Sequence, residues 1–337
     1  MSKTILLAGG AGFIGSHLAD SLIESGHKVF CADKFIMGDA NIEHLKLNPN
    51  FVLINCELAD EDQVEKLFEL GAVDGGFDAV YHLAANSDIQ KGGKEPSIDF
   101  NDTLMTTRTL LEVMRKHSVQ NLFFASTSAV YGDKGSEVLT ETTGDLRPAS
   151  YYGGCKLASE ALISSYVSMC DLNAVIFRFP NVIGPRLTHG VIYDFIRKLQ
   201  SNPAELEILG DGKQCKPYIY VLDLVEAIVS LTSSFLSDQD EEDRSGSADA
   251  AEQKGSEEIY NRSVESGGTT VTKIADIVCQ EMELKPAYHY TGGSVGWKGD
   301  VPKFAYDISK VLSTGWKPKH TSDEAVRQSV KDALSGN

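Results

Sequence analysis

The sequence predicts an α/β fold with a doubly wound parallel sheet, because short apolar segments alternate with helical patterns along its first half. The apolar segments have the length of buried strands and are apolar on both faces, as a sheet covered by helices on each side requires. The expected strands are residues 4–8, 28–33, 51–55, 79–83, 121–125 and 174–179. The expected helices between them are residues 14–25, 61–70, 103–117 and 152–170.

The second half of the chain has a less regular pattern. Asp223 is expected to cap the start of a helix over 223–235, and Thr321 with Glu324 predicts a capping box for a last helix ending near Leu334. The other expected elements are helices at 190–200 and 272–282 and a strand at 206–209. We therefore expect a Rossmann domain over 1–178, to which 214–236 returns, and a smaller mixed α/β domain over 179–337.

Charge and composition exclude several classes of protein. The net charge of −17 argues against a nucleic-acid-binding protein, which presents a basic surface. Much of the excess negative charge lies in residues 237–258. Because this segment also lacks large apolar side chains, we expect it to be a mobile acidic insertion. The six cysteines form no C-x-x-C pair and are typical of reduced thiols, with no metal site expected. With neither a membrane-length apolar run nor a leader pattern, we expect a cytoplasmic protein.

The first motif that carries chemistry is Gly9-Gly10-Ala11-Gly12-Phe13-Ile14-Gly15, directly after the first strand. Glycines at these positions allow a tight turn and let a pyrophosphate approach the backbone at the N-terminus of the next helix. Asp33 ends the second strand, where a carboxylate accepts hydrogen bonds from ribose hydroxyls and repels a 2′-phosphate. Together they favour NAD as cofactor, although Lys34 weakens that preference, and the alternative is a plain glycine turn.

The second motif is Tyr152 followed four residues later by Lys156, a spacing that places both on one face of a helix. A phenol is a poor base at neutral pH, but a nearby ammonium and a positive nicotinamide ring favour the phenolate. Tyr152 can then take a proton from a substrate hydroxyl while the adjoining carbon gives a hydride to NAD. The spacing alone is common by chance, and the preceding glycine motif is what gives it weight.

A third segment, residues 125–132, lies at the end of the fifth strand and carries three aliphatic hydroxyls in a row, Ser126, Thr127 and Ser128. Ligands bind at the carboxyl ends of strands in such sheets, so a hydroxyl here can bridge a substrate oxygen and Tyr152. The alternative is a hydroxyl-rich turn.

With these motifs the chain resembles the extended short-chain dehydrogenase/reductase family, in its branch of nucleotide-sugar epimerases and dehydratases. The resemblance covers nearly the whole length except the acidic insertion. It also rests on residues 82–85, 178–186, 210–214, 218–223, 307–310 and 315–316.

The resemblance implies a role for each matching position. Thr127 corresponds to the catalytic Ser/Thr, Tyr152 to the base and Lys156 to the ribose-binding lysine. The positions implied to bind NAD are Gly9, Gly12, Phe13, Ile14, Gly15, Asp33, Lys34, Glu57, Leu58, Leu83, Ala84, Ala85, Tyr152, Lys156 and Phe179. The positions implied to bind a nucleotide-diphosphate sugar are Ser87, Thr127, Asn181, Arg186 and Lys216.

Several positions depart from the family pattern. Ser128 and Ala129 stand where 4,6-dehydratases carry Asp-Glu, and decarboxylases keep a glutamate at the second place, so both activities are disfavoured. Glu57 replaces the usual aspartate near adenine, and Thr103 replaces an asparagine. Lys216 and Val295 replace arginines on the substrate diphosphate, which lysine cannot grip in the forked manner of arginine. The candidates to compensate are Arg186, Lys298 and Lys303.

Three functions from different classes fit these residues. The leading hypothesis is a nucleotide-sugar 4-epimerase that needs only Thr127, Tyr152 and Lys156. The second is a nucleotide-sugar dehydrogenase or 4-oxidase that releases the keto sugar and uses the same residues. The third is a non-catalytic dinucleotide-binding protein, although such relatives commonly lose the Tyr-Lys pair. The resemblance also implies a homodimer formed through the helices at 103–117 and 152–170.

Overall fold

The computed structural model describes residues 2–36, 38–86, 88–245, 255–265, 267–293, 301 and 303–336. These residues form two compact units, each built from several separate segments of the chain. The first unit comprises Met1–Val130, Ser150–Arg178 and Val225–Tyr260. The second comprises Tyr131–Ala149, Phe179–Leu224 and Asn261–Asn337.

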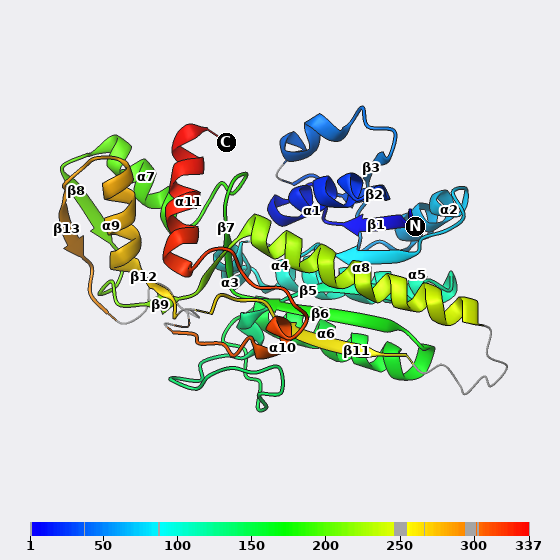
Figure 1. Cartoon of the computed structure of the whole chain (residues 1–337). Helices are drawn as coiled ribbons and strands as arrows, with labels where there is room; N and C mark the ends of the chain where they lie inside the picture. The colour runs from blue at the N-terminus through cyan, green and yellow to red at the C-terminus, as the bar shows by residue number, and fades with distance from the viewer. Residues whose placement is uncertain are drawn as a thin grey trace. The chain divides into compact units, whose positions relative to one another are not determined.

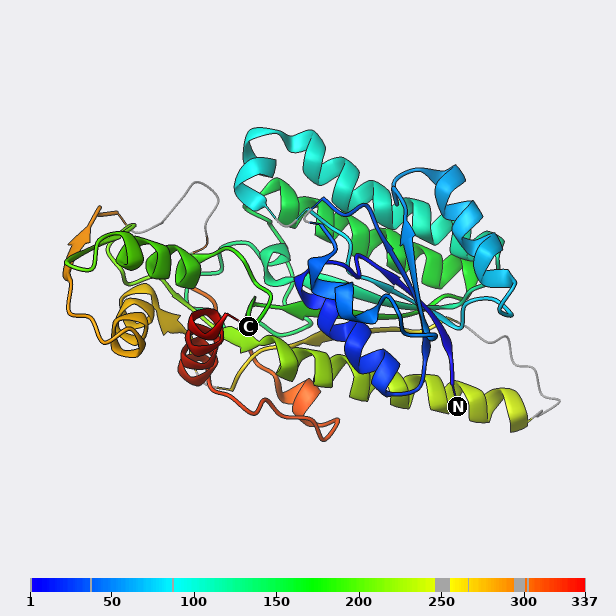
Figure 2. The same ribbon diagram turned by 90° about the horizontal axis from the view of Figure 1, so that it is seen from above.

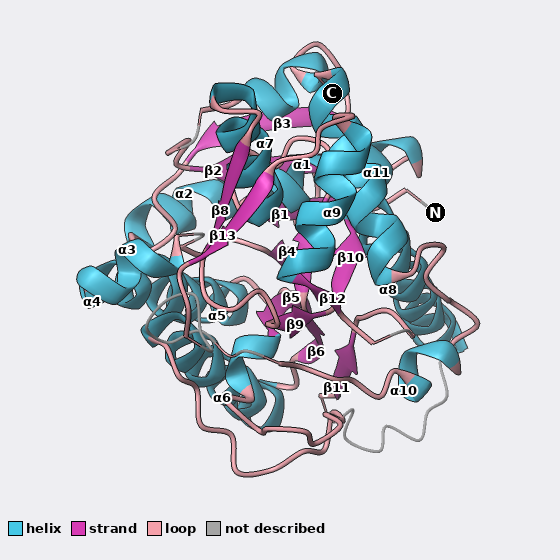
Figure 3. Ribbon diagram, turned by 90° about the vertical axis from the view of Figure 1, so that its left-hand side faces the viewer, coloured by secondary structure: helices cyan, strands magenta, loops and turns pink. Residues whose placement is uncertain are grey.

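The first unit is built on a seven-stranded sheet with the order β11-β6-β5-β4-β1-β2-β3, which Figure 3 shows from β3 to β11. The adjacent pairs β3–β2, β2–β1, β1–β4 and β4–β5 are parallel. The strand order reverses between β1 and β4, which is where doubly wound sheets bind ligands. The strands are β1 (Thr4–Ala8), β2 (Lys28–Asp33), β3 (Phe51–Asn55), β4 (Ala79–His82), β5 (Asn121–Thr127), β6 (Asn173–Phe179) and β11 (Glu257–Asn261).

Helices cover both faces of this sheet, as predicted. Figures 1 and 2 show α1 and α8 on one face and α2, α5 and α6 on the other. The buried Tyr81 hydroxyl of β4 donates to the Thr232 hydroxyl of α8 (2.6 Å), which ties that helix to the sheet. The helices are α1 (Phe13–Glu24), α2 (Glu61–Ala72), α3 (Ile89–Lys94), α4 (Pro96–Asp99), α5 (Thr106–Lys116), α6 (Tyr151–Cys170) and α8 (Val221–Ser245). Short helical turns are η1 (Ala40–Leu45), the π-helical η2 (Phe100–Met105) and η3 (Ser128–Val130).

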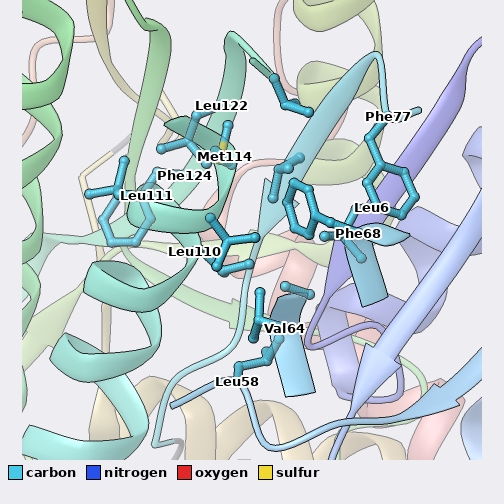
Figure 4. Close-up of a cluster of buried hydrophobic side chains, with 14 of the residues drawn as sticks. Leu6, Leu58, Val64, Phe68, Phe77, Leu110, Leu111, Met114, Leu122 and Phe124 are labelled. Atoms are coloured by element: carbon cyan, nitrogen blue, oxygen red, sulfur yellow. The ribbon is translucent and has the colours of Figure 1, made fainter. Parts of the chain in front are cut away.

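Apolar side chains between the sheet and α2, α5 and α6 form the core of the first unit (Figure 4). Phe68 of α2 packs edge-to-face on Phe77, with ring centroids 5.2 Å apart. Leu110 and Met114, one turn apart on α5, are buried beside Leu122 of β5. Side chains four residues apart lie on one helix face, so the apolar spacing of the sequence produces this packing.

The second unit is a smaller mixed α/β structure with three two-stranded sheets. Two are parallel, β7–β10 and β8–β13, and β9–β12 is antiparallel. Helices α7, α9 and α11 pack around a separate apolar core that includes Phe195, Ile277 and Val326. The predicted capping box is present, because Thr321 and Glu324 each bond to the other's backbone. The elements are β7 (Asn181–Ile183), α7 (Val191–Ser201), β8 (Glu205–Ile208), β9 (Cys215–Lys216), β10 (Tyr218–Tyr220), β12 (Thr269–Thr270), α9 (Val271–Glu281), β13 (Ala287–Tyr290), α10 (Ser309–Leu312) and α11 (Ser322–Ser335).

The structure divides the chain differently from the expected 1–178 and 179–337. The segment that returns to the sheet unit is Val225–Tyr260, rather than 214–236, because it includes β11, which pairs with β6 at the sheet edge. Residues Tyr131–Ala149 belong to the second unit, although they precede α6 in sequence. One reason is that the Tyr131 hydroxyl and the Leu139 carbonyl bond to the Asn261 side chain (2.6 and 3.2 Å).

Two local expectations were wrong. The acidic segment 237–258 is not wholly without structure, because α8 continues to Ser245 and β11 begins at Glu257; residues 246–254 lie outside the described part of the chain. The apolar face of α8, which includes buried Leu236, stabilises the helix up to the acidic segment. Because glutamate is a good helix former, the acidic residues can continue that helix. Asp223 is not a cap, because α8 starts two residues earlier; its Oδ2 accepts the backbone N–H groups of Lys319 (3.0 Å) and His320 (3.1 Å) instead.

No helix among the described residues is both long enough and apolar enough to cross a membrane.

Candidate active site

The glycine-rich turn lies between β1 and α1, at the point where the strand order reverses. Gly9 has a φ of 84°, and a Cβ on it would lie 2.6 Å from the backbone nitrogen of Ala84, which follows β4. A Cβ on Gly15 would lie 2.2 Å from the carbonyl oxygen of Gly9. Glycine is therefore required at both positions by close backbone approach. The loop that contains Leu83 and Ala84 is held against the same turn, since both N–H groups bond to the Ala8 carbonyl (2.8 and 3.0 Å).

The start of α1 is suited to an anion. No described side chain caps α1, and its N-cap is Gly12, so the first-turn amides of Phe13 and Ile14 face outward from an uncapped helix end. A Cβ at Gly12 would meet only the Gly9 carbonyl at 3.4 Å, which leaves the approach over the turn open. These features fit the pyrophosphate of a dinucleotide.

Asp33 lies at the end of β2, beside the turn. Its Oδ2 accepts the N–H of Ala11 (3.1 Å) and its Oδ1 accepts the N–H of Phe35 (2.9 Å), so the carboxylate is fixed in orientation. Burial raises its pKa, whereas these backbone hydrogen bonds lower it. Glu57 and buried Leu58 follow β3, the strand that pairs with β2.

Thr127 and Tyr152 meet where β5 ends and α6 begins. The Ser150 hydroxyl caps α6 by accepting the N–H of Gly153 (3.1 Å), which places half-buried Tyr152 in the first turn. Thr127 is the last residue of β5, and its Oγ1 accepts the N–H of Ala129 (3.2 Å), which holds that hydroxyl at the strand end. The Thr127 hydroxyl also lies close enough to the Tyr152 phenol to lower the pKa of that phenol by hydrogen bonding.

Lys156 lies one turn after Tyr152 and is 1% exposed. Its Nζ donates to the carbonyl of Ala125 (2.6 Å) and lies 4.5 Å from the centre of the Phe124 ring. Burial lowers the pKa of Lys156 to about 7, although the charge of Glu160 opposes the shift. Glu160 is itself paired with Arg178 (2.6 Å) and accepts a hydrogen bond from Ser126. The Lys156 amine has further N–H groups that can donate to additional acceptors.

Burial, a neighbouring hydroxyl and a neighbouring carboxylate set the pKa of Tyr152. Burial raises the pKa of Tyr152 to about 12, the hydrogen bond from Thr127 lowers it, and the charge of Asp99 raises it further. Lys156 is instead bound to Ala125. Thr127 is thus the side chain that moves the phenol toward the form needed for proton abstraction.

The sequence reasoning missed a buried carboxyl group, Asp99, at the end of α4. Its Oδ1 accepts the Asn86 side-chain amide (2.8 Å), and the backbone N–H of Asn86 donates to the Thr103 hydroxyl (3.2 Å). Within the described residues its Oδ2 has no hydrogen-bond partner, and burial raises its pKa. A Cβ on Gly92 would lie 2.1 Å from this oxygen, so Gly92 is the residue that makes room for it. The Gly92-Gly93 pair was the sequence signal for this close packing.

A second buried polar contact fixes the strand that precedes the Leu83–Ala84 loop. His82 is fully buried, and its Nε2 lies 3.0 Å from the Thr107 hydroxyl. Burial lowers its pKa well below the usual range, and the charge of Lys156 acts in the same direction, so the imidazole is neutral. His82 thus positions a segment of the site without titrating near neutral pH.

The residues predicted to bind substrate fall on both units, and the second unit holds Asn181, Arg186 and Lys216. Asn181 is paired in register with Tyr218, two residues after Lys216. Cys215 forms a bridge with Lys303, so Lys216 and Lys303 lie on neighbouring backbone segments. Phe179 ends β6. Ser87, Val295 and Lys298 lie outside the described residues.

The turn after Thr127 carries no acid. Ser128 and Ala129 begin η3 and are half-buried. Neither can give or take the second proton that removal of water across a C5–C6 bond needs. Among the described residues there is also no cluster of His, Cys, Asp and Glu able to hold a metal ion.

Comparison with known proteins identifies the family. Residues 5–243 match the NAD dependent epimerase/dehydratase family. The chain belongs to that family. Its cofactor is NAD, which the glycine turn and Asp33 predicted, and its fold is the α/β fold of the epimerase structures.

Relatives of this family member carry out more than one reaction. A crystal structure of UDP-galactose 4-epimerase is 34% identical, with a TM-score of 0.81 and 99% of both chains covered. UDP-glucuronic acid 4-epimerase from Bacillus cereus, solved with UDP-glucuronic acid and NAD, is 25% identical, with a TM-score of 0.82 over 99% of this chain and 100% of that one. A UDP-N-acetyl-α-D-glucosaminuronate decarboxylase from Bacillus cytotoxicus is 36% identical over 68% of this chain and 71% of its own.

Proposed function

We propose that this NAD-dependent family member is a UDP-sugar 4-epimerase. The observation that carries the proposal is the set of Thr127, Tyr152 and Lys156 around the ends of β5 and α6, with no carboxylate at Ser128 or Ala129. This set suffices to oxidise and reduce one alcohol, and it offers no acid for elimination. The 4-epimerases among the relatives support UDP as the nucleotide.

In the proposed reaction, the sugar C4 hydroxyl donates its proton to the Tyr152 phenolate, and the resulting ketone later recovers a proton from the same phenol. The Thr127 hydroxyl orients the sugar oxygen and lowers the pKa of Tyr152. Lys156 would hold the ribose hydroxyls of the cofactor, because among the described residues its buried amine donates to the Ala125 carbonyl and lies against the face of the Phe124 ring, which leaves N–H groups for the ribose. NAD, when bound, would supply the oxidising and reducing chemistry at C4, and the positive charge of its nicotinamide would oppose the raised pKa of Tyr152.

A lysine-based diphosphate site is part of this proposal. Lys216 and Lys303 lie on adjacent segments of the second unit, and Arg186 is on the loop after β7. Two ammonium groups can neutralise a diphosphate as point charges, without the forked geometry of arginine.

Decarboxylation is the second candidate function, because the Bacillus cytotoxicus relative is a decarboxylase. Oxidation at C4 would use the same tyrosine, but Ala129 stands where we expect decarboxylases to carry a glutamate. The dehydrogenase or 4-oxidase alternative uses the same residues and differs only in releasing the keto sugar.

The test is to incubate the purified protein separately with UDP-glucose, UDP-galactose, UDP-glucuronate and UDP-N-acetylglucosamine without added NAD. We expect at least one C4 epimer pair to reach the same equilibrium mixture from both sides, as followed by NMR. Release of carbon dioxide with a pentose product would support the decarboxylase instead. NADH accumulating in proportion to a keto sugar would support the oxidase.

Two substitutions of Thr127 distinguish the effect of its hydroxyl from the effect of its size. Thr127→Val is expected to lower kcat by about 10- to 100-fold and to move the acidic limb of the kcat/KM pH profile upward, because the lost hydrogen bond no longer lowers the pKa of Tyr152. Thr127→Ser keeps the hydroxyl and should restore most of the activity. If the acidic limb of the kcat/KM profile does not move in Thr127→Val, Thr127 does not lower the pKa of Tyr152.

We also propose that the protein forms homodimers through α5 and α6. Phe100, Tyr151 and Met169 are large apolar side chains exposed on or beside these helices. Sedimentation velocity should give twice the 36.6 kDa chain mass, and Met169→Glu should shift the protein toward monomer. Val73→Glu is the matched control, because Val73 and Met169 are each 82% exposed. A monomeric wild-type protein would contradict the proposal.

A further inference from the structure

The ammonium group of Lys34 is held between two carboxylates. Its Nζ lies 2.7 Å from Oδ1 of Asp102 and 3.3 Å from Oε2 of Glu57. The three residues come from separate segments: the end of β2, the end of β3 and η2. The Lys34 and Asp102 side chains are 29% and 22% exposed, so the pair is partly shielded from solvent.

The charge on Lys34 is stabilised by these contacts. Burial by itself lowers the pKa of the ammonium, but the hydrogen bond and charge of Asp102, followed by those of Glu57, raise the pKa above its usual value. The ammonium is therefore charged and has two anionic partners inside the protein.

The position of this cluster matters because Lys34 directly follows Asp33. In dinucleotide folds the acidic residue at the end of the second strand takes the ribose hydroxyls, and a nearby cation accommodates a 2′-phosphate. Asp33 is fixed against the glycine turn by its bonds to Ala11 and Phe35. Lys34 is thus the cation nearest along the chain to the place where a 2′-phosphate would lie. For this reason the sequence alone left the choice between NAD and NADP open.

We infer that Asp102 is a specificity-determining residue, which together with Glu57 holds Lys34 away from a 2′-phosphate and so enforces the selection of NAD over NADP. The cation that would bind the phosphate is already paired with two carboxylates, so it is not available to a 2′-phosphate. The inference rests on NAD dependence and not on which sugar reaction the protein carries out.

The test measures dissociation constants of NAD⁺ and NADP⁺ for the cofactor-free full-length protein by isothermal titration calorimetry, without sugar. Asp102→Asn keeps the size of the side chain and removes its charge. It is expected to lower the ratio of the NADP⁺ to the NAD⁺ dissociation constant by about tenfold, because Lys34 loses its shorter ion pair and becomes available to the 2′-phosphate. An unchanged ratio in a variant that still binds NAD⁺ would overturn the inference.

Variants of Lys34 test whether its ammonium affects NADP⁺ binding when it is paired with Asp102 and when it is not. Lys34→Met in the wild-type background should leave the ratio within about threefold, because the ammonium is already engaged. In the Asp102→Asn background the same change should abolish the gain in NADP⁺ binding. The inference is wrong if Lys34→Met alone weakens NADP⁺ binding about tenfold, or if the gain persists without the lysine.

A matched control is available at the opposite end of β2. Lys28 and Asp74 form an ion pair of similar length (2.6 Å) and exposure, away from the glycine turn. Asp74→Asn should leave the ratio unchanged, since it removes one negative charge and one ion pair without touching Lys34. If Asp74→Asn changes the ratio as much as Asp102→Asn does, the loss of one negative charge explains the effect and the inference is wrong. Because no sugar is present, a negative result leaves the proposed epimerase activity intact.

Discussion

Tyr152→Phe is expected to lower turnover of a UDP-sugar by about 100- to 10,000-fold while NAD binding is retained. In the proposed reaction the Tyr152 phenol takes the substrate proton, and Thr127 and Lys156 do not. Removing the phenol oxygen also removes the group with which the Thr127 hydroxyl interacts. The packing of α6 should survive, because the ring stays in place. The measurement is kcat with the substrate identified in the equilibration experiment, together with the NAD content of the purified protein.

The neighbouring tyrosine provides the control for this prediction. Tyr151 is also on the first turn of α6, but it is 56% exposed. Tyr151→Phe should keep kcat within about twofold, because it removes only an exposed hydroxyl and keeps the ring that we place at the dimer interface. If Tyr152→Phe turns over substrate like the wild type, another group removes the proton and the site is misassigned.

Lys156→Met is expected to lower turnover at least about 100-fold and at the same time to stabilise the cofactor-free protein at low pH. The pKa of Lys156 is lowered by burial from 10.5 to about 7. A lysine whose pKa is lowered in the folded state destabilises the folded protein below its unfolded pKa, and this cost grows as the pH falls and is complete below about pH 7. Methionine has similar length and carries no such cost, although the Ala125 carbonyl loses a donor.

The pH dependence isolates this contribution from other titrating groups. The free energy of unfolding of Lys156→Met minus that of the wild type should be larger at pH 6 than at pH 9, by on the order of 2–3 kcal/mol. Denaturant unfolding of both cofactor-free proteins at several pH values measures the difference. A difference that is constant with pH would mean that Lys156 keeps an ordinary pKa in the folded protein.

Much of the sheet could be predicted because its signals are local. The bounds of β1, β2 and β3 agree with the expected residues 4–8, 28–33 and 51–55, since each is a short apolar run bounded by turn residues. The glycine turn, Asp33 and the Tyr152–Lys156 spacing were also local patterns, and in the structure Thr127 ends β5 and Tyr152 lies in the first turn of α6.

The parts that could not be predicted depend on contacts distant in sequence. The edge strand β11 follows an acidic segment, and only its pairing with β6 identifies it as part of the sheet. The assignment of Tyr131–Ala149 to the second unit depends on the Asn261 side chain, more than 100 residues away. Asp99 and Asp102 precede the expected helix 103–117 and have no motif of their own. The start of that helix as the π-helical η2 was likewise not visible in the apolar spacing.

The fate of the C4 hydrogen tests the central claim most directly. Purified protein is mixed with UDP-galactose carrying deuterium at C4, without added NAD, and the UDP-glucose formed is analysed by NMR and mass spectrometry. If Tyr152 handles only the hydroxyl proton while the hydride leaves C4 and returns to it, deuterium should be retained at C4 of the product with no net NADH. Loss of the label to solvent, or its accumulation in NADH beside a released keto sugar, would contradict the account.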